Sequence, residues 1–365
     1  MRVLHVINTL KTGGAPRLVS ALVNALSKNP DIKVGVMVFE PSDDSPFLES
    51  LRQNPRVSLF ENYGKKILSL SSFRALRKIS KDFDIIHAHL FPTGYLASLN
   101  AIFGSKPLVY TEHSTFNKRR KYKFFRPIER IVYAGYDAVT AISPAVKQSL
   151  DSWLGKKKIA SRTEVIYNGV DIENFAGEKR RSDIATLFGR EGKPILMISR
   201  FVPAKDHPTL IRAIPLLKDA EAFVAFAGDG ETLPQMEELA DELNVSERCV
   251  FLGARHDIPR LVSASKIGVQ SSNWEGFGLT AVEMMSAGLP VLVSDVEGLR
   301  EVVANKFLTF QPHNSEALAD KINRLLSDEE YYSEMSGQAL GQASKFSIDK
   351  MVDAHLELYS RLIKQ

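Results

Sequence analysis

Two carboxylates on either side of a glycine-rich turn are the residues of this sequence with the most evident chemistry. Glu275 stands before the turn, and Glu283 lies inside a helix that is expected to begin near Gly278. Gly276 and Gly278 let the backbone approach a ligand closely, and the free N–H groups at the helix start would bind an anion such as a diphosphate. Two glutamates would repel phosphates, so they fit only if they bind hydroxyls while cations elsewhere neutralise the anion. A sugar nucleotide carries both hydroxyls and phosphates.

Cations that could neutralise such an anion stand earlier in the same half of the chain. Arg200 follows a predicted strand, and Lys205 comes just before a predicted helix. Arginine offers a fork of donors to phosphate oxygens and lysine a point charge, so both could reach one ligand; taken alone, they could also be two surface cations. Arg255 ends a further strand, where its planar group could hold a base. Gly228-Asp229-Gly230 ends another, as part of a site or only as a turn.

The first half of the chain offers weaker signals. Gly13 and Gly14 stand between a predicted strand and a predicted helix, which is the layout of a phosphate loop, although the full dinucleotide and P-loop fingerprints are missing. His87 and His89 share one face of a strand. They could begin a metal site, but no nearby cysteine or carboxylate pattern completes one, so no metal is expected. His113 follows another strand and could bond a substrate or carry a proton; a lone histidine is more often a capping or packing residue.

Short apolar runs alternate with helical patterns along the whole chain, which predicts a parallel α/β architecture. The predicted strands are residues 3–8, 33–39, 57–61, 84–88, 107–110, 137–142, 163–167, 194–199, 222–227, 249–252, 267–270 and 290–294. Because the pattern restarts in the second half, two doubly wound, Rossmann-like domains facing a cleft are expected. Domain boundaries are predicted at 1–167 and 168–345, with a hinge at 168–171 and a charged interdomain connection at 177–183.

Composition places the chain among globular proteins, with 44% hydrophobic and 25% charged residues in 365. The single cysteine, Cys249, is expected in a buried strand and leaves no disulfide within the chain, which fits a reducing cytosol. The N-terminus reads as a strand rather than a signal peptide, and no apolar run approaches membrane-spanning length. A cytoplasmic location is therefore expected.

A basic segment at residues 118–126 has six cations and three interleaved aromatic residues, in a half of the chain that is basic overall. Such a segment could bind anionic lipid, nucleic acid or a phosphorylated acceptor. A solvated, mobile loop is an equally good interpretation of the same composition. If it binds lipid, the protein would lie peripherally on the inner face of the membrane.

With these residues assembled, the chain resembles the retaining glycosyltransferases of family 4, which have the GT-B fold of two Rossmann-like domains. The resemblance covers nearly the whole chain. It is carried by Gly13-Gly14-Ala15, His87-x-His89, Thr111-Glu112-His113, Asn168-Gly169-Val170-Asp171, Ser199-Arg200, Lys205-Asp206, Gly228-Asp229-Gly230, Gly253 and the E-x7-E spacing of Glu275 and Glu283. Family members often have Glu after the Gly-Gly-Ala turn, and Pro16 stands here, which puts any acceptor contact of such a glutamate in doubt.

The resemblance implies a role for each matching residue. Arg200 and Lys205 would bind the donor diphosphate and stabilise the departing nucleotide. Glu283 would bind the ribose diol and Glu275 the hydroxyls of the donor sugar, while His113 would lie near that sugar. The remaining implied contacts are the backbone amides of Phe277, Gly278 and Leu279, which would hold phosphate or sugar, and the Gly13-Gly14 turn, which would approach the phosphates from the other domain.

The implied function is retaining sugar transfer by front-face attack, without a metal ion or other cofactor, and with Glu275 not acting as a nucleophile. The implied partners are a nucleotide-sugar donor, with UDP favoured over GDP or ADP, and a glycan or lipid-linked acceptor in polysaccharide or glycolipid assembly. Nucleic acid is not expected as a partner. A final helix at 346–365 would pack back on the first domain. Two alternatives remain open, a sugar-nucleotide epimerase of the same fold and a binding subunit without turnover.

Overall fold

The computed structural model describes residues 1–11, 13–42, 45–63, 66–104, 106–115, 117–155, 157–176 and 184–364, apart from the side chains of residues 118 and 158. The chain forms two compact units. The first combines Met1–Gly169 with Ile348–Gln365, and the second is Val170–Ser347. The boundaries thus lie two residues after the sequence-predicted ones. The charged connection predicted at 177–183 lies outside the described residues.

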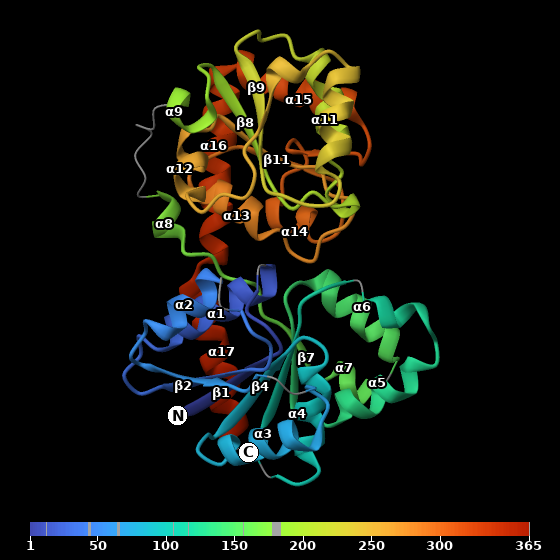
Figure 1. The fold of residues 1–365 in the computed structure, drawn as a ribbon. Helices are drawn as coiled ribbons and strands as arrows, with labels where there is room; N and C mark the ends of the chain where they lie inside the picture. Colours follow the sequence, from blue (N-terminus) through green and yellow to red (C-terminus); the bar gives the residue numbers. More distant parts are fainter. Residues whose placement is uncertain are drawn as a thin grey trace. The chain divides into compact units, whose positions relative to one another are not determined.

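The first unit is built on a parallel sheet of seven described strands in the order β3-β2-β1-β4-β5-β6-β7. The strands are β1 (Arg2–Ile7), β2 (Lys33–Val38), β3 (Val57–Glu61), β4 (Ile85–His89), β5 (Leu108–Glu112), β6 (Ala138–Ala141) and β7 (Thr163–Val165). Helices lie on both faces, as Figure 1 shows: α1 (Gly14–Leu26), α2 (Pro46–Arg52), α3 (Leu70–Ser80), α4 (Thr93–Ala101), η1 (Lys118–Lys121), α5 (Phe125–Ala134), α6 (Pro144–Leu154), α7 (Lys157–Ala160) and α17 (Ile348–Ile363).

The last helix, α17, completes the first unit although it follows the whole second unit in sequence. It packs against α1. Its Tyr359 hydroxyl lies 2.6 Å from Nδ1 of His87 on β4, and the sulfur of its Met351 accepts a hydrogen bond from the backbone N–H of Gly169 at 3.1 Å. Tyr359 is fully buried. The first unit is therefore closed by the C-terminal end of the chain.

The second unit is built on a parallel sheet of six described strands in the order β10-β9-β8-β11-β12-β13. The strands are β8 (Lys193–Ile198), β9 (Ala222–Ala227), β10 (Cys249–Phe251), β11 (Ile267–Gln270), β12 (Val291–Ser294) and β13 (Thr309–Phe310). The helices are α8 (Ile172–Ala176), α9 (Ile184–Phe188), η2 (Pro203–Lys205), α10 (His207–Ala213), η3 (Ile214–Leu216), α11 (Leu233–Glu242), η4 (Ser246–Arg248), α12 (Ile258–Ala264), α13 (Leu279–Ser286), α14 (Leu299–Val303), α15 (Ser315–Ser327), α16 (Glu329–Ala343) and η5 (Ser344–Phe346).

The apolar runs of the sequence explain these sheets. Parallel strands covered by helices on both faces read as nearly continuous hydrophobic runs, and every residue of β9 and β11 is buried. All twelve predicted strands are present with shifts of a few residues at their ends, and the predicted two-domain α/β fold is confirmed. The two-residue strand β13 has no periodic signal and was not predicted.

Both sheets have the same internal geometry. The strand order reverses between β1 and β4 in the first unit and between β8 and β11 in the second. At such a point the connections after the two central strands diverge to opposite faces of the sheet, so the carboxyl ends of these strands are the usual place for a ligand.

Candidate functional site

The loops after β8 and β11 lie side by side at the edge of the second sheet. The backbone N–H of Asn273 donates to the carbonyl of Ala204 at 2.8 Å, and the Ser271 hydroxyl donates to the carbonyl of Asp206 at 2.9 Å. These bonds join two segments about 70 residues apart in sequence. The loop that carries the predicted cations is therefore fastened to the loop that carries the first predicted carboxylate.

An ion pair between Lys205 and Glu275 is the centre of this edge. Lys205 Nζ donates to Glu275 Oε2, and the two side chains keep 20% and 22% of their exposure. The other carboxylate oxygen, Oε1, accepts from the backbone N–H of Gly276 at 3.2 Å. The sequence assigned the lysine to phosphate and the glutamate to hydroxyls. In the structure these two groups are direct partners, which sequence spacing did not predict.

The glycine turn forms the predicted start of α13. Gly278 caps the helix with φ of 93°, a conformation that glycine adopts without strain. A Cβ at this position would come within 2.5 Å of the buried Leu299 side chain. The Phe277 side chain is 2% exposed and packs edge-on against Phe346, with ring centres 5.3 Å apart. Phe277 could therefore contact a ligand only as the sequence predicted for it, through its backbone amide.

Glu283 lies on α13, four residues after Leu279 and so on the same side of the helix. Its side chain is only 1% exposed. The predicted ribose-binding carboxylate is therefore enclosed by protein, unlike Glu275.

Backbone packing positions Arg200, whose side chain is exposed. The N–H of Phe201, the next residue, donates to the carbonyl of Asp229 at 2.9 Å. Gly228 has φ of 151°, and a Cβ there would stand 1.9 Å from the Ser199 carbonyl oxygen. At Gly230 a Cβ would stand 2.3 Å from the Phe201 carbonyl oxygen. The glycines let the β9 loop lie directly against the loop of Arg200, and a role for this pair in a ligand site stays a prediction.

Arg255 is engaged by a carboxylate that sequence reasoning did not consider. Its Nε and Nη2 donate to the two oxygens of Asp257 at 2.7 and 2.6 Å. This hydrogen bonding raises the pKa of Arg255 and lowers that of Asp257. The donors at the edge of this planar group are thus directed at Asp257, only two residues away, and base binding by its plane stays a prediction. The pair could have been found from that spacing and opposite charge.

At the edge of the first sheet, Gly13 and Gly14 lie where the sequence placed them, between β1 and α1. Gly13 precedes the helix, and its carbonyl accepts from the N–H of Arg17 at 3.2 Å. A Cβ at Gly14 would meet nothing within 4 Å. The strand, turn and helix layout is confirmed, and phosphate binding by this turn stays a prediction.

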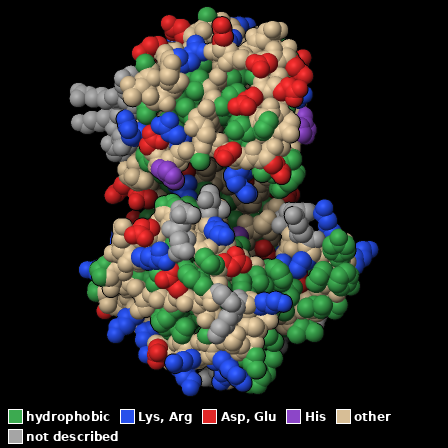
Figure 2. All heavy atoms as spheres, in the orientation of Figure 1, with side chains coloured by type: hydrophobic (Ala, Val, Ile, Leu, Met, Phe, Trp, Pro, Cys, Tyr) green, Lys and Arg blue, Asp and Glu red, His purple; other side chains and the backbone are tan. Residues whose placement is uncertain are grey.

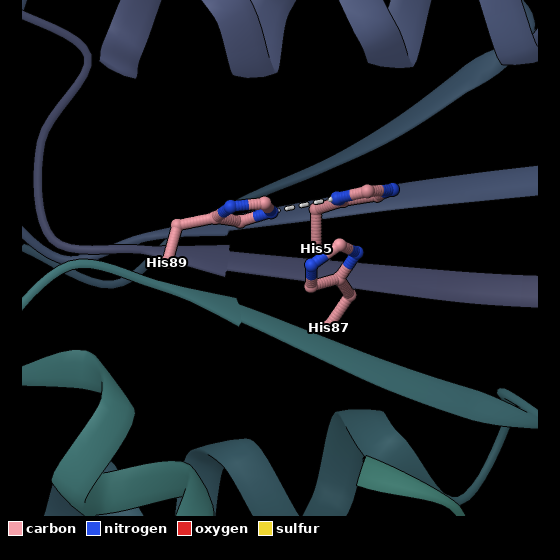
Figure 3. Close-up of side chains that lie close together, drawn as sticks. All are labelled: His5, His87 and His89. Atoms are coloured by element: carbon pink, nitrogen blue, oxygen red, sulfur yellow. Dashed lines mark hydrogen bonds between the residues drawn. The ribbon is translucent and has the colours of Figure 1, made fainter. Parts of the chain in front are cut away.

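His113 ends a chain of three histidines. Its Nε2 lies 3.2 Å from Nδ1 of His89, and Nε2 of His89 lies 3.0 Å from Nδ1 of His5 on β1. Figure 3 shows the rings of His5 and His89 meeting edge to edge, with His87 beside them. Burial lowers the pKa of His5 and His113 to about 3 and that of His89 well below its usual value, so the three rings are neutral at pH 7. Each neutral ring can donate with one nitrogen and accept with the other.

His5, His87 and His89 are also the group of described residues whose geometry could hold a metal ion, with ligand atoms within 4.8 Å of one another. The sequence reading found no third ligand because His5 comes from β1, where it pairs in register with His87. Both nitrogens of His87 already have partners, the Tyr359 hydroxyl and the Thr111 hydroxyl, each at 2.6 Å. A metal would have to displace one of them. A histidine inside an apolar strand was the signal that could have pointed to this cluster.

The basic segment 118–126 is structured where it is described. Arg120 donates to Glu112 at 2.8 Å, with about 10% and 8% of the two side chains exposed. Arg119 donates to the fully buried Glu129 at 3.0 Å, and Arg126 to the carbonyl of Trp153 at 2.6 Å. The interpretation of this segment as a solvated, mobile loop is wrong for these three arginines, because they hold α5 and α6 in place.

Among the described residues, no helix has both the length and the apolar character required to cross a membrane.

Two doubly wound parallel sheets, with ligand-type groups at the switch point of the second, define a two-domain α/β fold of the GT-B class. Family comparison agrees with this. Residues 12–174 match the family described as Glycosyltransferase Family 4, and residues 179–341 match Glycosyl transferases group 1. The chain therefore belongs to the glycosyltransferases of the family 4 type, as the resemblance indicated, and is an enzyme that transfers sugar.

Similar proteins extend over most of the chain. The UDP-Gal:alpha-D-GlcNAc-diphosphoundecaprenol alpha-1,3-galactosyltransferase of Escherichia coli is 27% identical over 335 residues, covering 87% of this chain and 84% of that protein. The crystal structure of Anabaena Alr3699/HepE in complex with UDP and glucose has a TM-score of 0.86 and 22% identity, covering 99% of this chain and 100% of the other. Sucrose-phosphate synthase from Thermosynechococcus elongatus has a TM-score of 0.82 and 19% identity, covering all of both chains.

Proposed function

We propose that this protein is a retaining, metal-independent glycosyltransferase. It takes a sugar from a nucleotide-sugar donor, with UDP favoured, and transfers it as a hexosyl or N-acetylhexosaminyl group to a glycan or lipid-linked acceptor in polysaccharide or glycolipid assembly. The observation that carries the proposal is the contact of Lys205 with Glu275 directly before the start of α13. A cation, a carboxylate and a helix N-terminus together suit an ionic diphosphate joined to a polyhydroxyl group.

Binding of the donor is expected to separate the ion pair between Lys205 and Glu275 and to engage both side chains. The donor diphosphate attracts Lys205 and Arg200, and the backbone amides of Phe277, Gly278 and Leu279 bind its oxygens. Once Lys205 turns to phosphate, the carboxylate of Glu275 is released and accepts hydrogen bonds from the sugar hydroxyls. A nucleoside diphosphate without the sugar would bind Lys205 but would offer no sugar hydroxyls to the Glu275 carboxylate. The intact donor is therefore expected to bind more tightly than its nucleoside diphosphate.

In the reaction, the bond from the anomeric carbon to the diphosphate oxygen breaks as the acceptor oxygen bonds to the same face of that carbon. The acceptor proton passes to the departing phosphate oxygen. Lys205 and Arg200 stabilise the negative charge that develops on the leaving group, and this stabilisation is the main contribution of the protein to the rate. Glu275 binds hydroxyls and is not the nucleophile. Glu283 binds the ribose, Arg255 the base, and a neutral His113 a sugar hydroxyl.

The choice of UDP and of a lipid-linked acceptor is supported by the similar proteins. The Escherichia coli enzyme is named for transfer of galactose from UDP-Gal to a sugar diphosphate-linked to undecaprenol, and the Anabaena protein was crystallised with UDP and glucose. Both names combine a uridine nucleotide with a sugar.

A thermal-shift screen against UDP, GDP, ADP and their sugars tests the donor assignment, because a ligand that binds the folded protein raises its Tm. UDP and one or more UDP-sugars are expected to raise the Tm, with the intact sugar donor giving the larger shift. A shift with GDP or ADP alone would reassign the nucleotide.

The two alternative functions are separated by turnover with the donor that binds. An epimerase would isomerise the nucleotide sugar with no acceptor present. A binding subunit would show the thermal shift but release no nucleoside diphosphate with any acceptor of a glycan and lipid-linked panel. The transferase is expected to release nucleoside diphosphate and to form a glycoside of the donor's own anomeric configuration.

A further inference from the structure

An apolar groove of about 810 Å³ lies on the surface of the first unit, between α3, α4 and α5. Its walls are almost entirely hydrocarbon, and it lies outside the residues assigned to donor binding. The lining residues come from these three helices, from the residues just before α3 and just after α5, and from the connection after α4. Large exposed apolar residues that line it are Leu68, Leu70, Leu99, Ile102, Phe103, Ile128 and Ile131.

The exposure of these side chains is unusual. Ile102 and Ile131 are 71% and 76% exposed, and Phe103 is 61% exposed. In the second unit no described large apolar side chain is more than 49% exposed, the value for Phe307, and Leu340 is 46% exposed. Single exposed apolar residues are ordinary, but a contiguous cluster marks an interaction surface.

The charge around the groove has one sign. The helix α3 carries Arg74, Arg77 and Lys78, whereas Arg126 and Arg130 of α5 donate to the backbone carbonyls of Trp153 and Leu154 at the end of α6. The three described helices contain a single carboxylate, Glu129, which has no exposure and accepts from Arg119 and from the Trp153 indole. Arg77 lies over the ring of Phe103, 5.5 Å from its centre. The groove is therefore hydrocarbon bordered by cations, and Figure 2 shows hydrophobic side chains with Lys and Arg beside them on this unit.

We propose that the apolar side chains around this groove insert into the hydrocarbon of an anionic membrane leaflet. The surrounding cations would then contact the phosphate headgroups of that leaflet. In this arrangement lipid chains cover the apolar walls, and the headgroups neutralise the positive charge beside them. A second copy of this chain is a poorer partner, since it would bring cations against cations. The proposal deepens the proposed function and rests on it for the lipid-linked acceptor. Vesicle binding requires no turnover, so the two can fail separately.

The groove lies outside the basic segment 118–126, which the sequence offered as one possible lipid contact. Arg119, Arg120 and Arg126 of the basic segment hold protein groups, so their removal would damage the fold as well as any lipid contact. Tyr122 and Phe124 of that segment are 57% and 64% exposed. The segment therefore adds aromatic side chains next to α5, while the helices around the groove supply the main apolar surface.

Vesicle flotation of the full-length protein tests the proposal, with phosphatidylcholine vesicles that contain or lack phosphatidylglycerol. Wild type is expected to float with the anionic vesicles and to bind the neutral ones less by about tenfold or more. The double variant Ile102→Asp/Ile131→Asp should lose about tenfold or more of the anionic partition coefficient. Arg74→Glu/Lys78→Glu should lose a similar factor, since each cation near an anionic surface contributes about fivefold.

Leu340→Asp on α16 is the matched control, because it places the same charge on an exposed leucine of the other unit and should bind as wild type. Folding of every variant is checked by its Tm and by the shift that UDP produces; a missing UDP shift in wild type would count against the proposed function only. Wild-type flotation by Ile102→Asp/Ile131→Asp, or no binding of wild type to anionic vesicles, would overturn the membrane proposal. So would a dimer in light scattering that this variant dissociates while vesicle binding persists, because the groove would then hold a second copy.

Discussion

The carboxyl edges of the two sheets have the same strand arrangement but carry different side chains. In the first unit, His5, His87 and His89 are strand residues, buried and neutral. In the second unit, Lys205 and Glu275 stand several residues beyond the ends of their strands and form a charged pair that keeps about a fifth of its exposure. The comparison teaches that the distance of a residue past the end of its strand decides whether its side chain is kept neutral or charged. Within the strand, helices on both faces exclude water, whereas on the loop a charge stays solvated enough to be used.

The two edges also differ in how they are held together. Side-chain hydrogen bonds join β1, β4, β5 and α17 in the first unit, through the histidines, Thr111 and Tyr359. Hydrogen bonds to backbone carbonyls join the loops of the second unit, and Gly228 and Gly230 permit very close approach there. The second arrangement leaves the side chains of the loops available for a ligand.

Lys205→Ala should have the largest effect, because it removes the cation that the charged edge depends on. The rate of nucleoside diphosphate release is expected to fall by about 10²–10³-fold, since charge on the leaving group loses its stabilisation. Steady-state release of nucleoside diphosphate is the measurement.

Lys193→Ala is the matched control for this variant. Lys193 also pairs with a carboxylate of the second unit, Asp219 at 2.8 Å, but it lies at the start of β8 rather than beyond its end. Its turnover should stay near wild type. Equal losses in both variants would mean that the position of Lys205 at the strand edge has no special role.

Gly228→Ala should cost about 3 kcal/mol of unfolding free energy, because the new Cβ would overlap the Ser199 carbonyl and the residue would keep a positive φ. Gly337→Ala on α16 is its control, since a Cβ there would meet nothing within 4 Å. In a helix this change stabilises by about 0.5–1 kcal/mol. Urea unfolding of both variants measures the difference. A tolerated Gly228→Ala would show that close packing of the two loops does not hold the edge.

The smallest effect concerns the neutral edge. Burial lowers the pKa of His355, whose ring lies 5.6 Å from that of His87, to about 4. Because the unfolded chain takes up this proton near pH 6.5 and the folded protein only near pH 4, stability falls as the pH decreases through that window. Between pH 7 and 5 the loss is about 2 kcal/mol per such histidine. His355→Gln should therefore reduce the pH dependence of the unfolding free energy by about this amount.

Urea unfolding of wild type and His355→Gln at the two pH values is the measurement, and an unchanged difference between pH 7 and 5 would contradict a buried neutral ring. EDTA offers a further check on the same edge. It is expected to leave the Tm of the wild type unchanged, whereas a fall would indicate that His5, His87 and His89 hold a metal.

The sequence by itself determined the strands, the start of α13 and the candidate groups at the edge of the second sheet. Apolar runs of strand length, glycines at turns and a cation just after a strand are local features, and they restrict the backbone in the same way wherever the segment packs. For this reason Arg200, Lys205, Gly278 and Glu275 could be nominated from their neighbours in the chain.

Only the tertiary structure decided which of these groups touch. The pairing of Lys205 with Glu275, the entry of His5 into the histidine chain and the closure of the first unit by Tyr359 join residues 70, 84 and 272 positions apart. Strand order and register set such contacts, and neither follows from the periodicity of a single segment. The groove between α3, α4 and α5 has the same origin, because its walls come from three helices that become neighbours only when the sheet beneath them has formed.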